Sequence, residues 1–135
     1  MNHRLTEDQQ TDAVKTLNIT EFVKVPEPIS NIWSNIPPDV ESISEILSPV
    51  VVWLSDQAST GDVALIQGDS GACYIMVTIA FDLGLLPVYA TTERITSEKS
   101  QKDGAVKIER QFRHVRFRKY QTPYQKDRIL CEAYT

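Results

Sequence analysis

The feature that most constrains the fold is a glycine-bounded turn between an apolar strand and an apolar helix. Residues 62–67, DVALIQ, form a nearly continuous apolar run of strand length, as expected for a strand that is buried on both faces. Gly68 to Gly71 then turn the chain, and ACYIMVTIAFDLG predicts a helix that ends at Gly84. A buried strand that turns tightly into a helix is typical of α/β proteins.

Helices and strands are also predicted before this turn. Thr6, with Gln9 three residues later, forms a capping-box pattern that predicts a helix ending near Asn18. EFVKVP, residues 21–26, is expected to be a strand stopped by prolines, and ISNIWSNIPPD a loop or a short helical piece.

A longer helix is predicted between Val40 and Ala58, where apolar residues recur at helical spacing. Pro49 lies inside this pattern. We expect it either to kink the helix or to begin a second one with Ser48 as its N-cap.

The remaining elements are a strand and a hairpin. LLPVYATTER, residues 85–94, predicts a buried strand with a polar carboxyl end, and a turn at residues 102–104 followed by a strand predicts an antiparallel hairpin. The apolar residues of the last strand change phase, which predicts a β-bulge or a break near Arg113 and His114. We therefore expect a three-layer α/β fold with a mainly parallel sheet and a C-terminal antiparallel hairpin.

The length of 135 residues allows one domain, expected over residues 1–120, with a loosely held tail over 121–135. A chain of this type normally opens on a strand, but Met1 stands only two residues before His3. We therefore expect that the first strand is missing and that the reading frame upstream encodes about six apolar residues, a normal strand length.

Composition indicates a soluble protein of the reduced cytosol. The longest apolar region is interrupted by Asp82, Gly84 and Pro87, so it is expected to be core rather than a membrane span. The N-terminus is polar and lacks the apolar stretch of a signal peptide. The two cysteines, Cys73 and Cys131, are expected to be unbridged, which favours a cytoplasmic location.

Charge is concentrated near the C-terminus. Residues 106–120, VKIERQFRHVRFRKY, hold six Lys or Arg and one acid, a local charge of +5. Since the net charge of the whole chain is −4, the remaining residues together carry a charge of −9. This basic strip is a candidate surface for an anionic ligand, and the alternative is a solvated charged strand.

The string Gly68-Asp69-Ser70-Gly71-Ala72 allows two interpretations. It satisfies the G-x-S-x-A pattern of a hydrolase nucleophile, but such a serine needs a downstream acid and then a histidine, and His114 in the basic strip is the only downstream histidine. Alternatively, the glycines let the backbone approach a ligand, and the N–H groups at the start of the helix bind a phosphate. A third possibility is that Asp69 or Ser70 only caps the helix.

Polar residues also follow the other predicted strands, and the carboxyl ends of parallel strands meet at one edge of a sheet. Hydroxyl, imidazole, indole and guanidinium groups at that edge suit a ribonucleotide. The candidates at that edge are His3, Trp33, Ser34, Asn35, Gln67, Thr91, Thr92, Glu93 and Arg94. His114 and Arg116, in the basic strip, are further candidates for ligand binding. The histidines and cysteines lie too far apart in sequence to suggest a metal site, and no cofactor motif is present.

Five strings together resemble a known family. NHRLTEDQ, IWSNIPP, LIQGDSGACYIMV, LGLLPVYATTER and FRHVRFRKY, within residues 2–120, are similar to the CRISPR-associated ring nucleases of type III systems, specifically the small Csx-type family numbered twenty. The resemblance implies a Rossmann-like fold related to the CARF sensor domain and a homodimer. It also implies binding of cyclic oligoadenylate, with the tetramer as the first choice, and slow cleavage without a metal or cofactor that ends an antiviral signal.

The resemblance implies ligand contacts for the loop Gln67, Gly68, Asp69, Ser70 and Gly71, and for the blocks around Trp33 and Thr91. The reaction would be attack of a ribose 2′-hydroxyl on its adjacent phosphodiester. We expect Arg94 on the phosphate, Ser70 with the loop amides in an orienting role, and His3 or His114 in proton transfer.

Three other functions remain open on the sequence. One is a sensor or sponge that holds cyclic oligoadenylate without cutting it, because the same loop would serve both. A small serine hydrolase is disfavoured by its missing partners. General RNA binding is permitted by the aromatic and basic residues of the strip, but the isoelectric point near 5.1 argues against affinity driven by bulk charge. Duplex nucleic acid is not expected as a partner.

Overall fold

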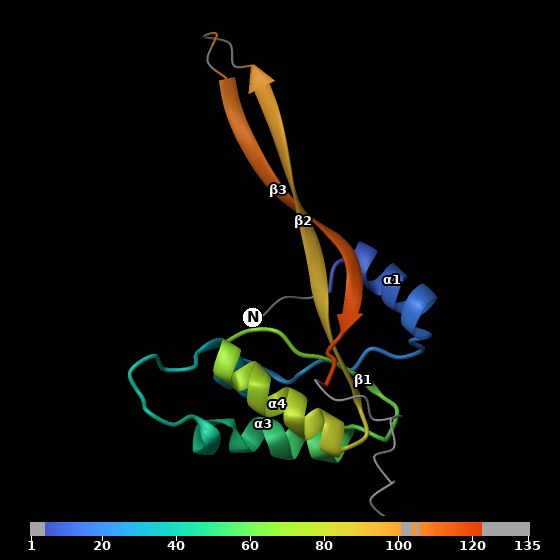
Figure 1. Ribbon diagram of the computed structural model, residues 1–135, viewed down its shortest axis with the longest axis vertical. Helices are drawn as coiled ribbons and strands as arrows, with labels where there is room; N and C mark the ends of the chain where they lie inside the picture. The colour runs from blue at the N-terminus through green and yellow to red at the C-terminus, as the bar shows by residue number, and fades with distance from the viewer. Residues whose placement is uncertain (1–4, 101–103, 105, 123–135) are drawn as a thin grey trace, which may run out of the picture.

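The computed structural model describes residues 5–100, 104 and 106–122, with residues 97–100 and 106–110 described by their backbone alone. Four helices and three strands follow one another along the chain (Figure 1). They are α1 (Glu7–Leu17), α2 (Glu27–Ser34), α3 (Ser44–Gln57), β1 (Val63–Leu65), α4 (Ser70–Asp82), β2 (Leu86–Ser100) and β3 (Val106–Lys119).

The three strands form one mixed sheet in the order β1-β2-β3. β1 pairs with β2 in parallel, and β2 pairs with β3 in the antiparallel direction, which confirms the predicted hairpin. The expectation of a mainly parallel sheet is wrong for these strands. The reason is that LLPVYATTER does not end a strand, because it continues into the first arm of the hairpin as one 15-residue strand.

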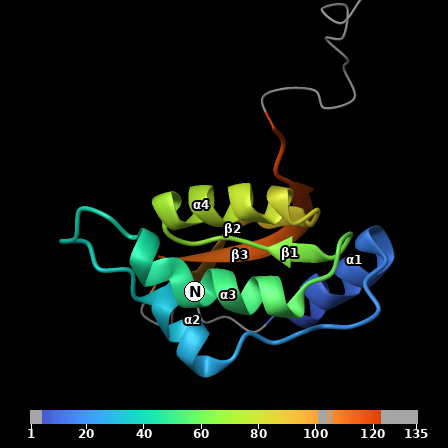
Figure 2. The ribbon, with the colours of Figure 1, turned by 90° about the horizontal axis from the view of Figure 1, so that it is seen from below.

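Helices lie on both sides of the sheet, as expected for three layers. Figure 2 shows α4 on one side and α1, α2 and α3 on the other. The β2–β3 hairpin leaves this layered body as a long arm that extends beyond all the helices (Figure 1).

Two apolar clusters hold the body together. The larger joins α3, β1 and α4 through Leu47, Val50, Ala64, Ile66, Ala72, Met76, Ala80 and Leu85. The smaller joins α1 to the sheet through Ala13, Val88 and Phe117. The apolar face predicted for residues 40–58 is thus confirmed, because it supplies the α3 side of the larger cluster.

Local signals set several element boundaries as predicted. The capping box of Thr6 and Gln9 is formed in both directions, and α1 ends at Asn18, which has a left-handed φ of 55°. Gly84, with φ 74°, follows α4. The helical alternative for the segment around Trp33 is confirmed, because it forms most of α2.

Two sequence expectations are wrong in this region, and one of the two alternatives for Pro49 is excluded. Residues 21–26 form no strand and pair with none in the described part of the chain, and Val23 is 57% exposed. Pro49 does not begin a second helix, because α3 continues through it. Pro49 and Glu45 are both exposed, so water can satisfy the Glu45 carbonyl that a proline cannot bond. β1 is not buried on both faces, because its Leu65 is 39% exposed, and among the described residues it is an edge strand.

The predicted bulge is confirmed, within two residues of its expected place. Thr91 lies opposite Arg116, but Thr92 lies opposite His114, so Val115 is an extra residue in β3. The extra residue lets His114 and Phe117 face α1 together, and their rings contact at a centroid distance of 4.8 Å.

His114 joins β3 to α1 through a carboxylate. Its Nε2 lies 2.8 Å from Asp12 Oδ2, and its side chain is only 7% exposed. The Thr16 hydroxyl donates to the Asp12 backbone carbonyl at 2.8 Å and lies 3.1 Å from its Oδ1. The hydrogen bond from His114 holds the pKa of Asp12 below its usual value of 3.8.

Within the described residues, none of the helices has both the length and the apolar character needed to cross a membrane.

Replacing Asp12 by alanine tests this connection. Because its pKa is lowered in the folded protein, ionised Asp12 stabilises the fold above pH 3.8, and this contribution declines as the pH falls through its folded pKa. We expect Asp12→Ala to lower the free energy of unfolding by about 1–3 kcal/mol at pH 7 and by less near pH 3. Urea unfolding measures both values. Asp56→Ala, at an exposed position of α3, is the control, and an equal loss in the two variants would contradict the prediction.

Candidate functional site

The loop after β1 is held against α2 by a tryptophan. Trp33 Nε1–H donates a hydrogen bond to the Gln67 carbonyl oxygen at 2.9 Å. Gly68 has φ 152°, and a Cβ at this position would lie 2.8 Å from Trp33 Nε1. Both the backbone conformation and the close approach of the indole therefore require glycine here.

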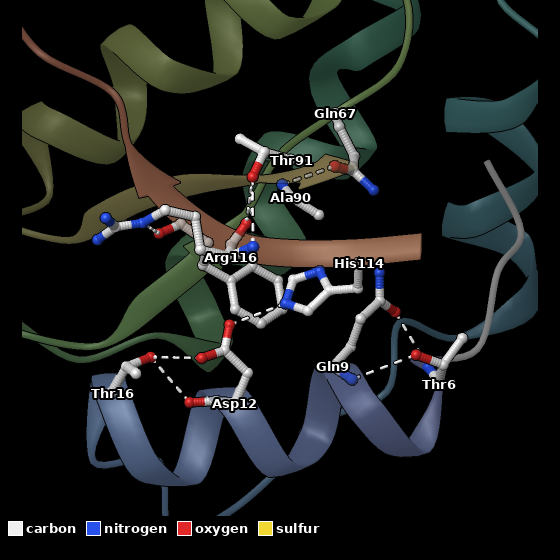
Figure 3. Close-up of polar contacts among 10 residues, drawn as sticks. Thr6, Gln9, Asp12, Thr16, Gln67, Ala90, Thr91, His114 and Arg116 are labelled. Carbon is white, nitrogen blue, oxygen red and sulfur yellow. Dashed lines mark hydrogen bonds and ion pairs between the residues drawn. The ribbon is translucent and has the colours of Figure 1, made fainter. Parts of the chain in front are cut away.

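The same loop is held to the sheet by the side chain of Gln67. The Ile66 N–H donates to the Val88 carbonyl at 2.9 Å, which extends the pairing of β1 with β2 by one residue. Beyond that point Gln67 Oε1 accepts from the Ala90 N–H at 3.0 Å (Figure 3). A side chain thus replaces the backbone acceptor where the chain turns away from the sheet, and it positions the loop at the carboxyl end of β1.

α4 begins directly after this loop. Asp69 Oδ2 accepts from the Ala72 N–H at 3.0 Å, so the interpretation of Asp69 as a helix cap is confirmed. Ser70 is the first residue of the helix, and Ser70 and Gly71 are both exposed. Their N–H groups have no acceptor within the helix, and they lie at its positive end, which is the arrangement that binds anions.

A shallow pocket lies between α2 and the loop. It is lined by Trp33, Ser34, Ile36, Gly68 and Asp69. Four of these five residues are ones that the sequence analysis proposed as ligand contacts. Asn35, between two of them, ends α2 and donates from Nδ2 to the Asn31 carbonyl at 2.8 Å. The structure therefore brings the Trp33 block and the glycine loop to one place.

The two threonines of the next block are separated by the sheet. Thr91 and Arg116 lie opposite one another, and the Thr91 hydroxyl donates to the Arg116 carbonyl at 3.1 Å. Thr92 pairs instead with His114, on the side that faces α1. Of the pair, Thr91 is thus on the α4 side, and Thr92 is on the opposite face.

Two residues expected in catalysis are not brought to the loop. Arg94 lies on the arm, four residues beyond Ala90 and thus about 13 Å further along β2, with its guanidinium 5.5 Å from the Phe112 ring centroid. His114 points toward Asp12 on α1, away from Gln67 (Figure 3). His3 lies outside the described residues, as do Cys131 and most of the predicted tail.

The serine-hydrolase interpretation gains no support from this arrangement. Ser70 begins α4, whereas the one histidine that the structure describes is bonded to α1 through Asp12. A nucleophilic serine needs a histidine within hydrogen-bond reach of its hydroxyl.

Tyr120 and Cys73 are neighbours of the loop that the sequence analysis did not select. The Tyr120 hydroxyl donates to the Ile66 carbonyl at 2.7 Å. Burial raises the pKa of both the Cys73 thiol and the Tyr120 hydroxyl, so neither group is a ready nucleophile. Sequence carries no signal for this contact, because the hydrogen bond joins residues 54 positions apart.

No three His, Cys, Asp or Glu side chains gather to form a possible metal site in the part of the chain that the structure describes.

Comparison with known proteins places the chain in a family. The model of the family described as uncharacterized protein MJ1673 matches residues 1–118. The chain belongs to this family. The protein named "Uncharacterized protein MJ1673" from Methanocaldococcus jannaschii is 47% identical over 123 residues, which cover 91% of this chain and 94% of that protein. No solved structure matches the chain. The matched residues of the family model include the whole loop and the blocks around Trp33 and Thr91.

Gln67 offers a test of how the loop is held. Gln67→Ala should leave the Ala90 N–H without its acceptor and lower the free energy of unfolding by about 1–3 kcal/mol. Gln67→Glu keeps an acceptor oxygen and should retain most of the stability. Urea unfolding measures the loss, and amide hydrogen exchange at Ala90 locates it, because exchange should accelerate only in the alanine variant. Equal exchange in both variants would contradict the role given to Gln67.

Proposed function

We propose that this member of the MJ1673 family binds a cyclic oligoadenylate, with the tetramer as the preferred ring, at the carboxyl end of β1 and cleaves it slowly without a metal ion. The observation that supports this most is the pocket in which Trp33 and Ser34 meet Gly68 and Asp69 at the start of α4. An indole suits an adenine base, and the exposed N–H groups of a helix N-terminus suit a phosphate.

The position of the pocket in the fold is a second line of support. β1 and β2 are parallel and are joined by α4, and the pocket lies outside the carboxyl end of β1. Open parallel sheets bind nucleotides in this position. We therefore propose that the α/β body is a Rossmann-like unit related to CARF domains, that it works as a homodimer in the cytoplasm, and that it takes part in type III CRISPR defence.

The proposed reaction depends more on the alignment of the attacking 2′-oxygen with the phosphorus than on a strong base. A ribose 2′-oxygen attacks the adjacent phosphorus, the bond from phosphorus to the 5′-oxygen breaks, and the 2′-hydroxyl proton passes to that 5′-oxygen. The product is a linear chain with a 2′,3′-cyclic phosphate. The Ser70 hydroxyl and the N–H groups of Ser70 and Gly71 would hold the phosphate oxygens and align the attack.

A specific observation favours the non-catalytic alternative, a sensor or sponge. The one described histidine, His114, is held on the α1 side by Asp12 and is 7% exposed, so it supplies no general base to the loop. Binding without cleavage would use the same pocket, and one assay separates the two functions.

Incubation with cyclic tetra-adenylate in EDTA, followed by chromatography, tests the proposal. We expect linear products that carry a cyclic phosphate. Gly68→Val should abolish binding and cleavage, because the new side chain would collide with Trp33. Gly61→Ala is the matched control, because Gly61 also has a positive φ, 93°, but lies before β1, at the opposite end of that strand. An intact ring that elutes with the protein would support the sensor, and an intact ring that does not bind would remove both functions.

Arg94 can be tested separately as the cation on the phosphate. If the arm takes part in the reaction, Arg94→Ala should slow cleavage about 100-fold, which is typical of losing one group that stabilises transition-state charge. Its side chain is exposed, so the fold should be unaffected. Single-turnover rates with the purified variant measure the effect. A rate equal to that of the unaltered protein would remove Arg94 from the mechanism.

A further inference from the structure

The face of the hairpin that is turned away from α1 carries a row of arginines. Phe117 is buried toward α1, so the residues on either side of it, Arg116 and Arg118, point to the opposite face. Their cross-strand neighbours on that face are Thr91 and Tyr89. Arg116 and Arg118 are both exposed, and no helix of the body covers this part of β3 in Figure 1.

Two tyrosines form a shelf at the lower end of this row. The rings of Tyr89 and Tyr120 contact at a centroid distance of 4.8 Å with an interplanar angle of 54°. The bond from the Tyr120 hydroxyl to the Ile66 carbonyl holds one ring in place. Arg118 donates from Nη1 to the Tyr89 hydroxyl at 3.1 Å, and its guanidinium lies 5.6 Å from the Tyr89 ring centroid. The aromatic surface is therefore held by contacts on both sides before any ligand arrives.

A shallow pocket opens on this shelf. It is lined by Tyr89, Arg118, Lys119, Tyr120 and Gln121, and none of these five lining residues carries a carboxylate. Glu93, further along the same face, forms an ion pair with Arg113. The positive charge of Arg116, Arg118 and Lys119 is thus not neutralised by an acidic residue lining the pocket.

The chemistry of this surface matches a nucleic-acid strand better than a protein. Alternate residues of a strand are spaced by about 7 Å, which is comparable to the spacing of successive phosphates in an extended chain. An arginine has five N–H donors, and Arg118 uses one on Tyr89, so donors remain for a phosphate. Tyrosine rings beside cations are the usual platform for unpaired bases.

We propose that this surface, defined by Tyr89, Arg116, Arg118, Lys119 and Tyr120, binds single-stranded nucleic acid, with the cations on its phosphates and the tyrosines against its bases. The surface includes no residue of the Trp33 pocket, so the inference is independent of cyclic oligoadenylate binding. The acidic isoelectric point near 5.1 does not oppose it, because the local charge of the basic strip acts at this surface.

Salt dependence gives a quantitative test. Fluorescence anisotropy with a labelled oligoadenylate RNA of roughly twelve nucleotides, and with the DNA of the same sequence, measures affinity over a range of salt concentrations. Three cations on a single strand predict a slope of log K against log salt of about −2. Arg118→Ala should weaken binding and make the slope less steep by about 0.7. Lys15→Ala, on α1 at the other side of the sheet, should change neither quantity.

The tyrosine shelf is tested by a variant whose effect does not depend on salt. Tyr89→Ala should weaken binding about 10-fold with an unchanged slope, because stacking releases no counterions. Tyr89→Phe keeps the ring and should retain most of the affinity.

The comparison of RNA with DNA tests which groups of the strand are recognised. Tighter binding of the RNA strand would show that the protein contacts the 2′-hydroxyl, and equal affinities would show binding through phosphates and bases alone. Either result supports the proposal.

Three results would overturn the proposal. One is that neither strand binds at low salt to protein whose folding has been checked by circular dichroism. Another is that Arg118→Ala and Lys15→Ala bind equally well. The third is that Gly68→Val abolishes binding of the linear strands as well as the ring, because the arginine row would then belong to the Trp33 pocket. If the unaltered protein binds the linear strands but neither binds nor cleaves the ring, only the proposed function is contradicted.

Discussion

The extra residue at Val115 is the constraint on which the arrangement of the hairpin depends. Side chains of a strand alternate between faces, so His114 and Phe117, three positions apart, would lie on opposite faces without it. With it, both face α1, where Phe117 packs in the smaller core and His114 reaches Asp12. Arg116 and Arg118, two positions apart, lie together on the opposite face, and without the extra residue His114 would share that face with them. One inserted residue therefore separates His114, which attaches α1, from the arginines of the opposite face.

The loop after β1 is shaped by side chains that bond to backbone. Trp33 donates to the Gln67 carbonyl, Gln67 accepts from the Ala90 N–H, and Tyr120 donates to the Ile66 carbonyl. These bonds come from α2, from the loop itself and from the end of β3, and they satisfy backbone groups at the point where β1 leaves the sheet. A preformed loop of this kind loses little entropy when it binds a ligand, which suits both functions proposed for the pocket beside it.

The candidate site was predictable where its residues are close in sequence or follow short strands. The glycine turn, its helix cap and the Trp33 block were selected from local patterns, and the structure gathers Trp33, Ser34, Gly68 and Asp69 around one pocket. Arg94 was selected because a strand was expected to end there. β2 instead continues to Ser100, since its pairing with β3 supplies partners for the later residues, and Arg94 lies on the arm. Tyr120 was missed because only the sheet brings it to Ile66.

The sequence by itself determined the elements whose signals are local. The capping box, the left-handed Asn18, the glycine turn into α4 and the antiparallel hairpin follow from hydrogen bonds and backbone conformations within a few residues. Tertiary structure alone decided which strands have partners and which face each side chain takes. Residues 21–26 have a strand-like composition but no neighbouring strand, and so they remain unpaired. A strand exists only through hydrogen bonds to another strand, and its faces are set by register, so no short segment encodes either property.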